Sequence, residues 1–346
     1  MADFYDITNW NEKPWFQTGG TRSKVIIENP ENRKIYYFKT SLKKEKIDYK
    51  YEFWSEIIAS EVGTLLGFDL LRYDIAFNSK EIGCISESMT QEGVNKLTEG
   101  VSYLTGYDTT YNPKDKNSKK QYTFQLIFEA LGFFQLSRFA ENIIQIIIFD
   151  SIIGNSDRHQ ENWGIITTYN DIIATIEEIA KKEKKGFFEK QLFSLLAITS
   201  KAKRKDLENV VKNLHLIMPG NFSQIYDSGS CLGRELSDEK TEQMLMDKSL
   251  IDTYIRKGVS EIHWEGKKLN HFDLIRKVNN VQPEMVRKTI QKVISNYNEN
   301  KIQSIVNNID LNLPKKLVSN KLPIKRKELV IKLITLRVQN LTELIK

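Results

Sequence analysis

Residues 152–166 read IIGNSDRHQENWGII, a short polar loop between two apolar runs. Within the loop, Asp157 and Asn162 are five positions apart, and an Arg–His pair directly follows the aspartate. Asn155, Ser156 and Asp157 all favour turns, so an ordinary turn explains the loop alone about as well as a functional site does. The choice between the two interpretations depends on other parts of the chain.

A second acidic motif favours the functional interpretation. Residues 225–233 read IYDSGSCLG, in which Asp227 follows two apolar residues and precedes a glycine-containing turn. Phosphoryl transfer needs a carboxylate beside the attacking hydroxyl and hard oxygen ligands for Mg²⁺. Asp157 and Asn162 can supply the base and one ligand from a single loop, and Asp227 can supply the other ligand. Together the motifs predict a phosphotransferase that uses ATP and Mg²⁺.

A lysine on a predicted strand would complete such a site. Lys39 ends the strand pattern KIYYFK, where its cation can reach the α- and β-phosphates of a nucleotide. Most lysines at strand ends simply extend into water, which is the alternative interpretation. Glu56 and Glu61 lie on the next predicted helix, and either can pair with Lys39 or face solvent. Their spacing does not choose between them.

Three further features give weaker signals. The stretch TGGTRSK at residues 18–24 can cradle phosphates through backbone N–H groups, although a Gly-Gly turn between strands needs no ligand. The strand end Glu87, Ser88 and Met89 is a candidate hinge that binds adenine through backbone groups, although most strand ends bind nothing. We group His159 with Asp157 in the catalytic set, as a side chain that braces the loop by hydrogen bonding. The four histidines are widely spaced and predict no metal cluster.

The order of predicted elements before residue 90 is strand, strand, helix, strand, strand. The strands have β-branched and aromatic patterns, and the helix has apolar positions at three- and four-residue spacing up to Gly67. The predicted segments are residues 25–27, 34–39, 51–67, 70–77 and 81–89. This order is typical of a small sheet with one helix packed on it.

The rest of the chain has a helical character. We expect a polar, mobile loop, then two buried helices, then a Lys/Glu-rich amphipathic helical insert, and finally several helices broken by prolines. These segments are residues 106–120, 121–153, about 171–218, and 237–346. We therefore predict an α+β, two-lobed protein-kinase-like fold. It has a small β-rich N-lobe with one helix (residues 1–90) and a larger, mainly helical C-lobe (residues 91–346).

Composition limits the classes of protein to which the chain can belong. The 346 residues are 40% hydrophobic and 28% charged, as in soluble globular proteins, and the net charge of +6 gives no reason to expect direct nucleic-acid binding. The first residues lack the pattern of a signal peptide, and the longest apolar run is too short to span a bilayer. Cys84 and Cys231 are expected to be reduced thiols. We predict a cytoplasmic protein without a membrane span; export as an effector stays open.

The two motifs resemble those of a known family. GNSDRHQENWG resembles the catalytic loop of HipA-like serine/threonine kinases, and IYDSGSCLG resembles the magnesium-binding segment of the CtkA (cell-translocating kinase) subgroup. WSEIIASEVGTLLGF is similar to the single N-lobe helix of this family, and KIYYFK is similar to its lysine-bearing strand. The resemblance covers most of the chain except roughly residues 100–120 and 170–218.

This resemblance implies a role for each matching residue. Asp157 would be the catalytic base, Asn162 and Asp227 would hold Mg²⁺, and Lys39 would contact the ATP phosphates. Glu56 would be the partner of Lys39, because it matches the S-E-x-x-A run. The phosphate loop would comprise Gly19, Gly20, Thr21, Arg22, Ser23 and Lys24. The residues that could be autophosphorylated in or beside this loop are Ser23, Thr21 and Thr18.

The chain also departs from the family pattern. The gap between Asn162 and Asp227 is much longer than the expected hairpin, and the helical insert fills it, either to dock a partner or as a surface elaboration. An extra N-terminal domain of the HipA toxin type is not recognisable, so dimerisation and antitoxin contacts are not assumed, although an antitoxin-like partner is compatible with the sequence.

The leading hypothesis is a kinase that phosphorylates Ser or Thr of a protein substrate, including itself. Two alternatives remain. One is a lipid or small-molecule kinase of the same fold, because D-R-H-x-x-N also resembles the catalytic loop of phosphatidylinositol kinases. The other is a pseudokinase or toxin-type binding module.

Overall fold

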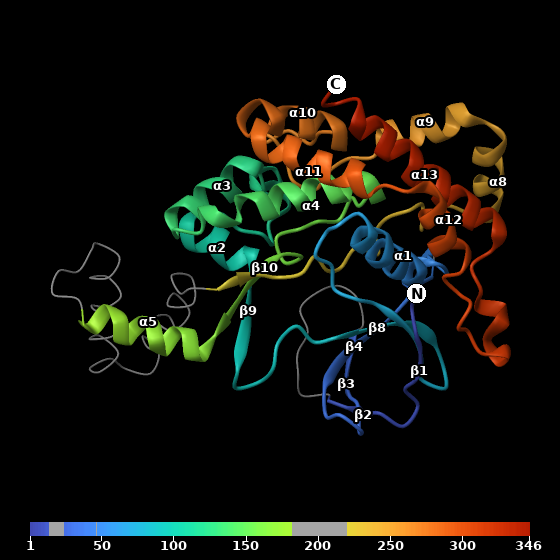
Figure 1. Cartoon of the computed structure of the whole chain (residues 1–346), viewed down its shortest axis with the longest axis horizontal. Coiled ribbons are helices and arrows are strands. Elements are labelled where there is room, and N and C mark those ends of the chain that lie inside the picture. The colour runs from blue at the N-terminus through green and yellow to red at the C-terminus, as the bar shows by residue number, and fades with distance from the viewer. Residues whose placement is uncertain (14–23, 46, 182–219) are drawn as a thin grey trace. The chain divides into compact units, whose positions relative to one another are not determined.

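The computed structural model of the chain describes residues 1–13, 24–45, 47–181 and 220–346 (Figure 1). These residues form two compact units. The first unit comprises Met1–Ser88, Glu141–His159 and Gln224–Lys346, and the second comprises Met89–Ala140 and Gln160–Ser223. A curled sheet and most of the helices belong to the first unit, so the fold is α+β, with a sheet lobe and a helical lobe, as predicted. The division of the chain into lobes at about residue 90 stays a prediction.

The sheet of the first unit has six strands in the order β1-β7-β8-β4-β3-β2. Its strands are β1 (Phe4–Asp6), β2 (Asn11–Glu12), β3 (Lys24–Glu28), β4 (Ile35–Thr40), β7 (Asp74–Phe77) and β8 (Ile82–Glu87). Strand β1 runs parallel to β7, and all other neighbours are antiparallel. The four predicted strands are confirmed as β3, β4, β7 and β8. A separate two-stranded sheet joins β5 (Lys43–Lys44) to β6 (Ile47–Asp48).

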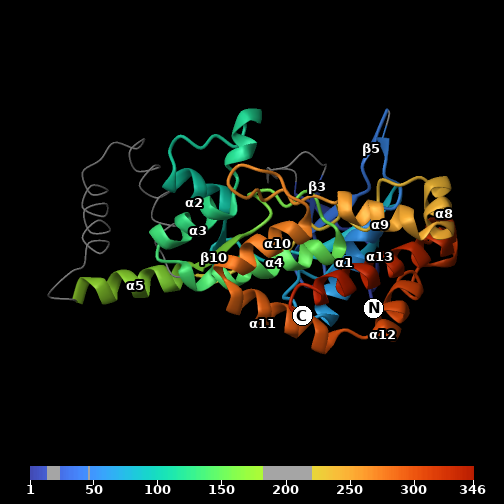
Figure 2. The ribbon, with the colours of Figure 1, turned by 90° about the horizontal axis from the view of Figure 1, so that it is seen from above.

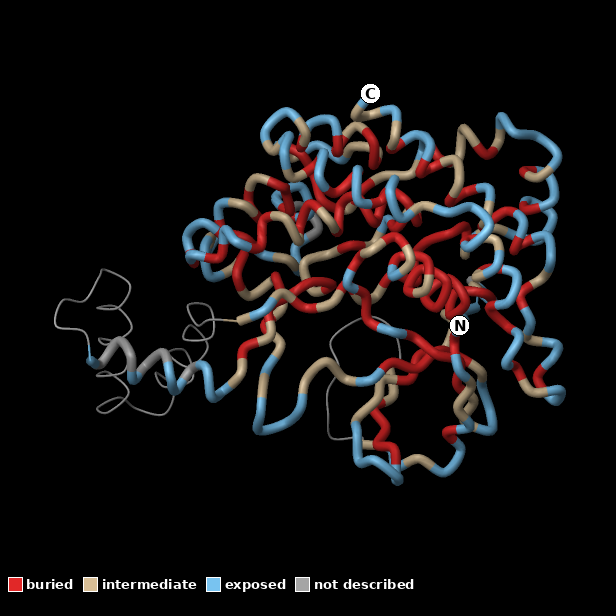
Figure 3. The backbone as a smooth tube through the Cα atoms, in the orientation of Figure 1, coloured by how far each residue is buried: buried red, intermediate tan, exposed pale blue. Residues whose placement is uncertain are grey.

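The predicted N-lobe helix is confirmed as α1 (Glu52–Leu65). It packs against β4 and β8 on one side and against α12 (Glu299–Asn307) on another. Because neighbours surround it, nearly every turn of α1 is buried, including Trp54 and Ile57 at 0% exposure (Figure 3). Gly67, with φ of +91°, follows the helix and lets its last turn close, as the sequence predicted.

Helices make up the rest of the first unit. Helix α4 (Ala140–Ile153) is mostly apolar and is buried apart from the half-buried Glu141, Asn142 and Gln145, as expected for a central helix. The later helices are α8 (Asp238–Met246), α9 (Lys248–Lys257), α10 (His271–Val281), α11 (Pro283–Asn296), α12 and α13 (Ile324–Thr342). Pro283 begins α11, and Pro314 and Pro323 flank a 3₁₀ turn (η3, Lys315–Asn320). Helix α13 lies against α8, α9, α11 and α12 (Figure 2).

The second unit contains a three-stranded antiparallel sheet in the order β11-β10-β9, which the sequence did not predict. Its elements are β9 (Asn95–Glu99), α2 (Gly100–Tyr107), η1 (Lys116–Gln121), α3 (Phe124–Phe133), η2 (Ser137–Phe139), β10 (Gly164–Thr168), α5 (Tyr169–Lys181) and β11 (Asn221–Phe222). Helices α3 and α4 confirm the two buried helices predicted in residues 121–153. The predicted helical insert begins as α5, and its remainder, residues 182–219, lies outside the described residues.

None of the helices in the described ranges combines the length and the apolar character that crossing a bilayer requires. Both cysteines are free thiols, as expected, and the structure buries both of them.

Close packing of β8 on β4 gives a first prediction, for Gly83→Ala. A Cβ atom at Gly83 would lie 2.0 Å from the carbonyl oxygen of Lys39, and backbone atoms cannot move aside. We expect the substitution to destabilise the protein by about 1–3 kcal/mol, measured by urea denaturation. Gly132→Ala is the matched control, because the nearest atom to its new Cβ lies 4.0 Å away and helices favour alanine. Equal stability of the two variants would contradict the prediction.

Candidate active site

The centre of the candidate site is a buried ionic cluster inside the first unit. Nζ of Lys39, on β4, lies 3.0 Å from Oδ1 of Asp227 and 3.7 Å from Oε2 of Glu56, on α1. Lys39 is 7% exposed and Glu56 is 2% exposed. Glu61, the alternative on the same helix, instead pairs with the N-terminal amino group at 3.3 Å. The structure therefore resolves the choice that the spacing left open, in favour of Glu56.

The carboxylates of this cluster favour the charged form of Lys39. Burial alone would lower the pKa of Lys39, but the carboxylates of Asp227 and Glu56 raise it well above its usual value. Lys24, at the start of β3, lies 3.3 Å from the second carboxylate oxygen of Asp227. Asp227 thus faces two ammonium groups, one at each oxygen.

Backbone contacts fix Asp227 in place. Ile225 pairs with Leu70 through an isolated parallel bridge, which brings the IYDSGSCLG segment beside the end of α1. The N–H of Asp227 donates to the hydroxyl of Tyr73 at 3.2 Å, and the N–H of Ser228 donates to Glu56 at 2.6 Å. Asp227 has φ of 55°, a left-handed conformation that aspartate tolerates better than most residues.

Arg158 connects the loop that carries Asp157 to the segment that carries Asp227. Its guanidinium donates to both oxygens of Asp150, on α4, at 2.9–3.3 Å. It also donates to the carbonyl of Tyr226 and to the hydroxyl of Ser228, the latter at 2.9 Å. Arg158 is 1% exposed and Asp150 is 3% exposed. This buried pair sets the position of the aspartate that precedes Arg158 in the chain.

Asp157 itself is half-buried and accepts a hydrogen bond from the hydroxyl of Ser230 at 3.1 Å. Its N–H donates to the side-chain oxygen of Asn155 at 3.2 Å, which is the Asx turn that the sequence suggested. Ser230 lies three residues after Asp227, so the two aspartates are linked through one short segment. His159 also belongs to the first unit and is half-buried.

Asn162 lies in the second unit, at the other end of the same loop. It is buried, and contacts on both sides hold its neighbours in place. Val101 donates to the carbonyl of Gln160 at 2.9 Å, and Gly100 donates to that of Trp163 at 2.8 Å. A Cβ at Gly100 would lie 2.2 Å from the Trp163 ring, so only glycine allows this approach. The ends of the loop are therefore anchored in different units.

The predicted hinge and phosphate loop are described only in part. Glu87 ends β8 and forms an exposed ion pair with Lys34 at 2.8 Å. The N–H of Ser88 donates to the carbonyl of Ile35 at 2.8 Å, so this donor is occupied by the sheet. Met89 begins the second unit. Lys24 is the one predicted phosphate-loop residue within the described ranges; Thr18, Gly19, Gly20, Thr21, Arg22 and Ser23 lie outside them.

The sequence interpretation missed Asp150, Arg158, Ser230 and Tyr73. Asp150 gave the clearest available signal, because a carboxylate within the mostly apolar run of residues 143–153 needs a buried partner. Burial raises the pKa of Asp150, and the adjacent Arg158 opposes this rise. Nothing in the local sequence identifies Arg158 as that partner.

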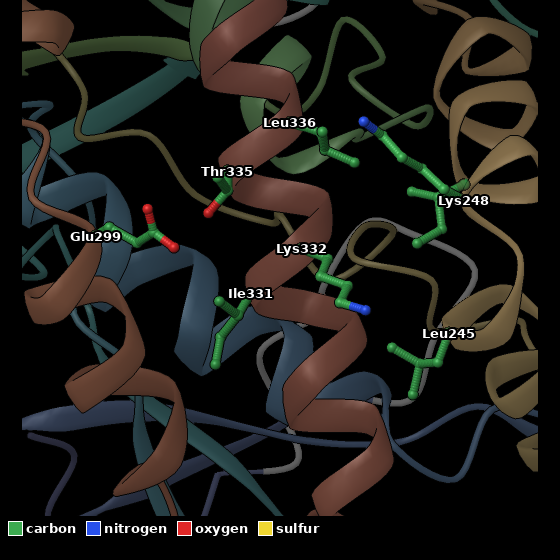
Figure 4. A pocket seen from close by; sticks show the side chains of 8 residues that line it. Leu245, Lys248, Glu299, Ile331, Lys332, Thr335 and Leu336 are labelled. Carbon is green, nitrogen blue, oxygen red and sulfur yellow. The ribbon is translucent and has the colours of Figure 1, made fainter.

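A separate cavity of about 260 Å³ lies along α13 (Figure 4). Thr335 and Ile331 line it on the side of Glu299, and Lys332 lines it on the side of Leu245 and Lys248. None of the residues predicted from the sequence lines this cavity.

Comparison with solved structures identifies the fold. The chain is similar to the crystal structure of the Helicobacter pylori proinflammatory kinase CtkA, with a TM-score of 0.68 and 16% sequence identity over 98% of both chains. It also matches HipA from a Shewanella oneidensis complex of HipA, HipB and operator DNA, with a TM-score of 0.49 and 12% identity, over 98% of this chain and 67% of that one. No protein-family model and no curated protein matches the sequence. The chain has the kinase-like fold seen in CtkA.

Proposed function

We propose that this kinase-like chain transfers the γ-phosphoryl group of ATP, with Mg²⁺, to a Ser or Thr hydroxyl of a protein, including its own. The observation that carries the proposal is the buried cluster of Lys39, Glu56 and Asp227, joined through Arg158 and Ser230 to the Asp157 loop. A core that needed only stability would gain little from it, because burying charges costs about as much as pairing them returns. The arrangement suits a site that handles a polyanion.

In this proposal, Lys39 binds the α- and β-phosphates, and Glu56 holds its ammonium in position. Lys24, the last residue of the predicted phosphate loop, lies close enough to Asp227 to share this role. When phosphates enter, the two lysines exchange one anionic partner for another, so neither charge is left unpaired. The remaining phosphate-loop residues and the candidate autophosphorylation residues lie outside the described ranges.

The donor set fits Mg²⁺. Mg²⁺ bound with a nucleotide takes most of its ligands from phosphates and water, and one or two from the protein. The carboxylate of Asp227 and the amide oxygen of Asn162 are hard donors of the right kind. In the described residues, no group of three or more His, Cys, Asp or Glu side chains could hold a metal, so a site built wholly from protein ligands is not expected there. The metal would neutralise charge on the phosphates.

Asp157 is the proposed base. Its carboxylate would accept a hydrogen bond from the acceptor hydroxyl, orient it toward the γ-phosphate, and take its proton as the new P–O bond forms. Ser230, which donates to the same carboxylate, keeps it oriented. His159 would brace the loop, and the strand end at Glu87, Ser88 and Met89 would contact adenine. The buried free thiols fit a reducing compartment such as the cytoplasm.

The test is incubation of the protein with γ-labelled ATP and Mg²⁺. Label should appear on Ser or Thr, and excess EDTA should prevent its incorporation. Lys39→Met should lower the initial rate about 100-fold or more, because one preorganised cation is lost. Lys34→Met is the matched control, because Lys34 is exposed and pairs only with the exposed Glu87 among the described residues.

The same assay separates the alternatives. Equal labelling by wild type and Lys39→Met would contradict the proposal. ATP turnover that requires added phosphatidylinositol or a small alcohol would favour a lipid or small-molecule kinase. Absence of ATP binding by calorimetry would favour a pseudokinase.

A further inference from the structure

A cavity of about 330 Å³ adjoins the proposed base, inside the first unit. Two of its lining residues are neighbours of Asp157: Ser156 precedes it in the chain, and Ser230 donates to its carboxylate. Gly154, at the start of the same loop, also lines the cavity. A protein segment that offers its hydroxyl to Asp157 therefore has this cavity beside it.

The cavity contains a buried cation with unused hydrogen-bonding capacity. Arg337, on α13, lines it and is 2% exposed. Nη1 of Arg337 donates to the carbonyl of Ser151 at 3.0 Å, near the C-terminal end of α4, where a cation is favourable. A guanidinium has five N–H donors, so this contact leaves most of them for another acceptor. Within the described part of the chain, no carboxylate forms an ion pair with Arg337.

The other charged side chains that line the cavity favour an anion. Lys257, the last residue of α9, is exposed and has no ion pair among the described residues. Arg234 is already neutralised, because it pairs with Glu52 and lies 4.6 Å from the centre of the Tyr49 ring. Glu235 is the acidic residue of the lining. Its carboxylate accepts the hydroxyl of Tyr254 at 2.8 Å and is exposed, so solvent screens it.

The pKa values of Arg337 and of the nearby His271 both bear on the charge at this end of the cavity. Burial lowers the pKa of Arg337, although Tyr254, Cys231 and Glu235 oppose this shift. Burial and the cations of Arg337 and Lys268 lower the pKa of His271 to about 3, so this histidine is neutral and adds no charge. A bound carboxylate would therefore relieve the cost of holding a guanidinium in this position.

We propose that this cavity binds an acidic side chain of the acceptor protein, so that the enzyme prefers Ser or Thr residues with Asp or Glu nearby in sequence. Arg337 would hold the carboxylate through charge-assisted hydrogen bonds, and Lys257 would attract it from the rim. This inference rests on the proposed kinase function, and it assigns a substrate class to the same site.

A peptide series tests the inference directly. Each peptide carries one serine, with Asp, Ala, Lys or phosphoserine placed in turn at each of the neighbouring positions. With wild-type protein and MgATP, kcat/KM should be highest for Asp, roughly five- to tenfold above Ala at the best position, and lowest for Lys. If kcat/KM is higher for the phosphoserine peptide than for the Asp peptide, the cavity still binds an anion. The preferred substrate is then a protein that has already been phosphorylated.

Charge reversal provides the matched variants. Lys257→Glu should invert the preference, so that the Lys peptide becomes better than the Asp peptide. Arg256→Glu should leave the preference unchanged, because Arg256 is its exposed neighbour on α9 and does not line the cavity. Equal kcat/KM for Asp, Ala and Lys peptides at every position would overturn the inference, as would an equal effect of Arg256→Glu.

A binding measurement separates this inference from the kinase proposal. The affinity of a labelled Asp peptide for the Asp157→Asn variant is measured by fluorescence anisotropy, with and without Lys257→Glu. One outcome is that Lys257→Glu weakens peptide binding while the wild-type protein transfers phosphate to no acceptor. That outcome would support an acidic-peptide site and overturn the kinase function. Transfer without an acidic preference would overturn the cavity's role alone.

Discussion

Asp157→Asn is expected to lower the rate of phosphoryl transfer about 100- to 10,000-fold, the usual contribution of a positioned general base. An amide cannot take a proton from the acceptor hydroxyl, but its oxygen can still accept the hydroxyl of Ser230. The fold and the position of residue 157 should therefore persist. The measurement is the initial rate of label transfer from γ-labelled ATP at saturating nucleotide.

The controls for this variant distinguish loss of chemistry from loss of structure. Nucleotide affinity, measured by calorimetry, should stay near the wild-type value, because Asp157 has no proposed role in binding ATP. Ser230→Ala should have a smaller effect on the rate, because it removes a contact that orients the base and leaves the base itself. A folded Asp157→Asn protein that transfers phosphate at the wild-type rate would refute the assignment.

Arg158→Leu is expected to lower the free energy of unfolding by about 3–5 kcal/mol, the usual result of removing one partner from a buried ion pair. The substitution leaves Asp150 at 3% exposure with the side chain of Asn155, 3.1 Å away, as its remaining hydrogen-bond donor. It also removes the contacts that Arg158 makes to Tyr226 and Ser228. Urea denaturation at neutral pH measures the loss.

Two further variants test the cause of this destabilisation. Arg158→Leu combined with Asp150→Leu should recover part of the lost stability, because no unpaired charge is then buried. Arg276→Leu should change the free energy of unfolding by less than about 1 kcal/mol, since its ion pair with Asp273 is exposed. If Arg158→Leu and Arg276→Leu lower the free energy of unfolding by similar amounts, burial of the Arg158–Asp150 pair is not the cause of the destabilisation.

Local sequence patterns predicted the elements that local patterns can determine. Strands β3 and β4 consist largely of β-branched and aromatic residues, and α1 has apolar residues at helical spacing, so both have the expected form. Strand β1 is only three residues long and pairs with β7, some seventy residues later, so its strand state depends on tertiary contact. The strand state of β9 and β10 also depends on tertiary contact, because the α-helices α2, α3 and α4 and two 3₁₀ helices separate them in the chain.

In the candidate site, too, some features follow from local sequence and others depend on tertiary contact. Asp157, Asp227 and Lys39 could be selected from sequence because each lies in a motif of suitable residues. The choice of Glu56 over Glu61 needed the helix orientation, because both lie on α1 and differ only in which neighbours they meet. The cavity beside Asp157 could not be foreseen, because Arg337 and Lys257 come from helices that are distant from the loop in sequence.

The contact between α13 and the Asp157 loop has a consequence for biosynthesis. Arg337 reaches the carbonyl of Ser151, and Arg326, also on α13, donates to the carbonyls of Gly233 and Leu236. A ribosome makes the loop long before it makes this helix, and chains begin to fold from the N-terminal side. A nascent chain whose α13 has not yet emerged from the ribosome therefore lacks these anchors of the Asp157 loop and of the segment after Asp227. The phosphoryl transfer proposed for this chain would then arise only once this late helix has emerged and docked.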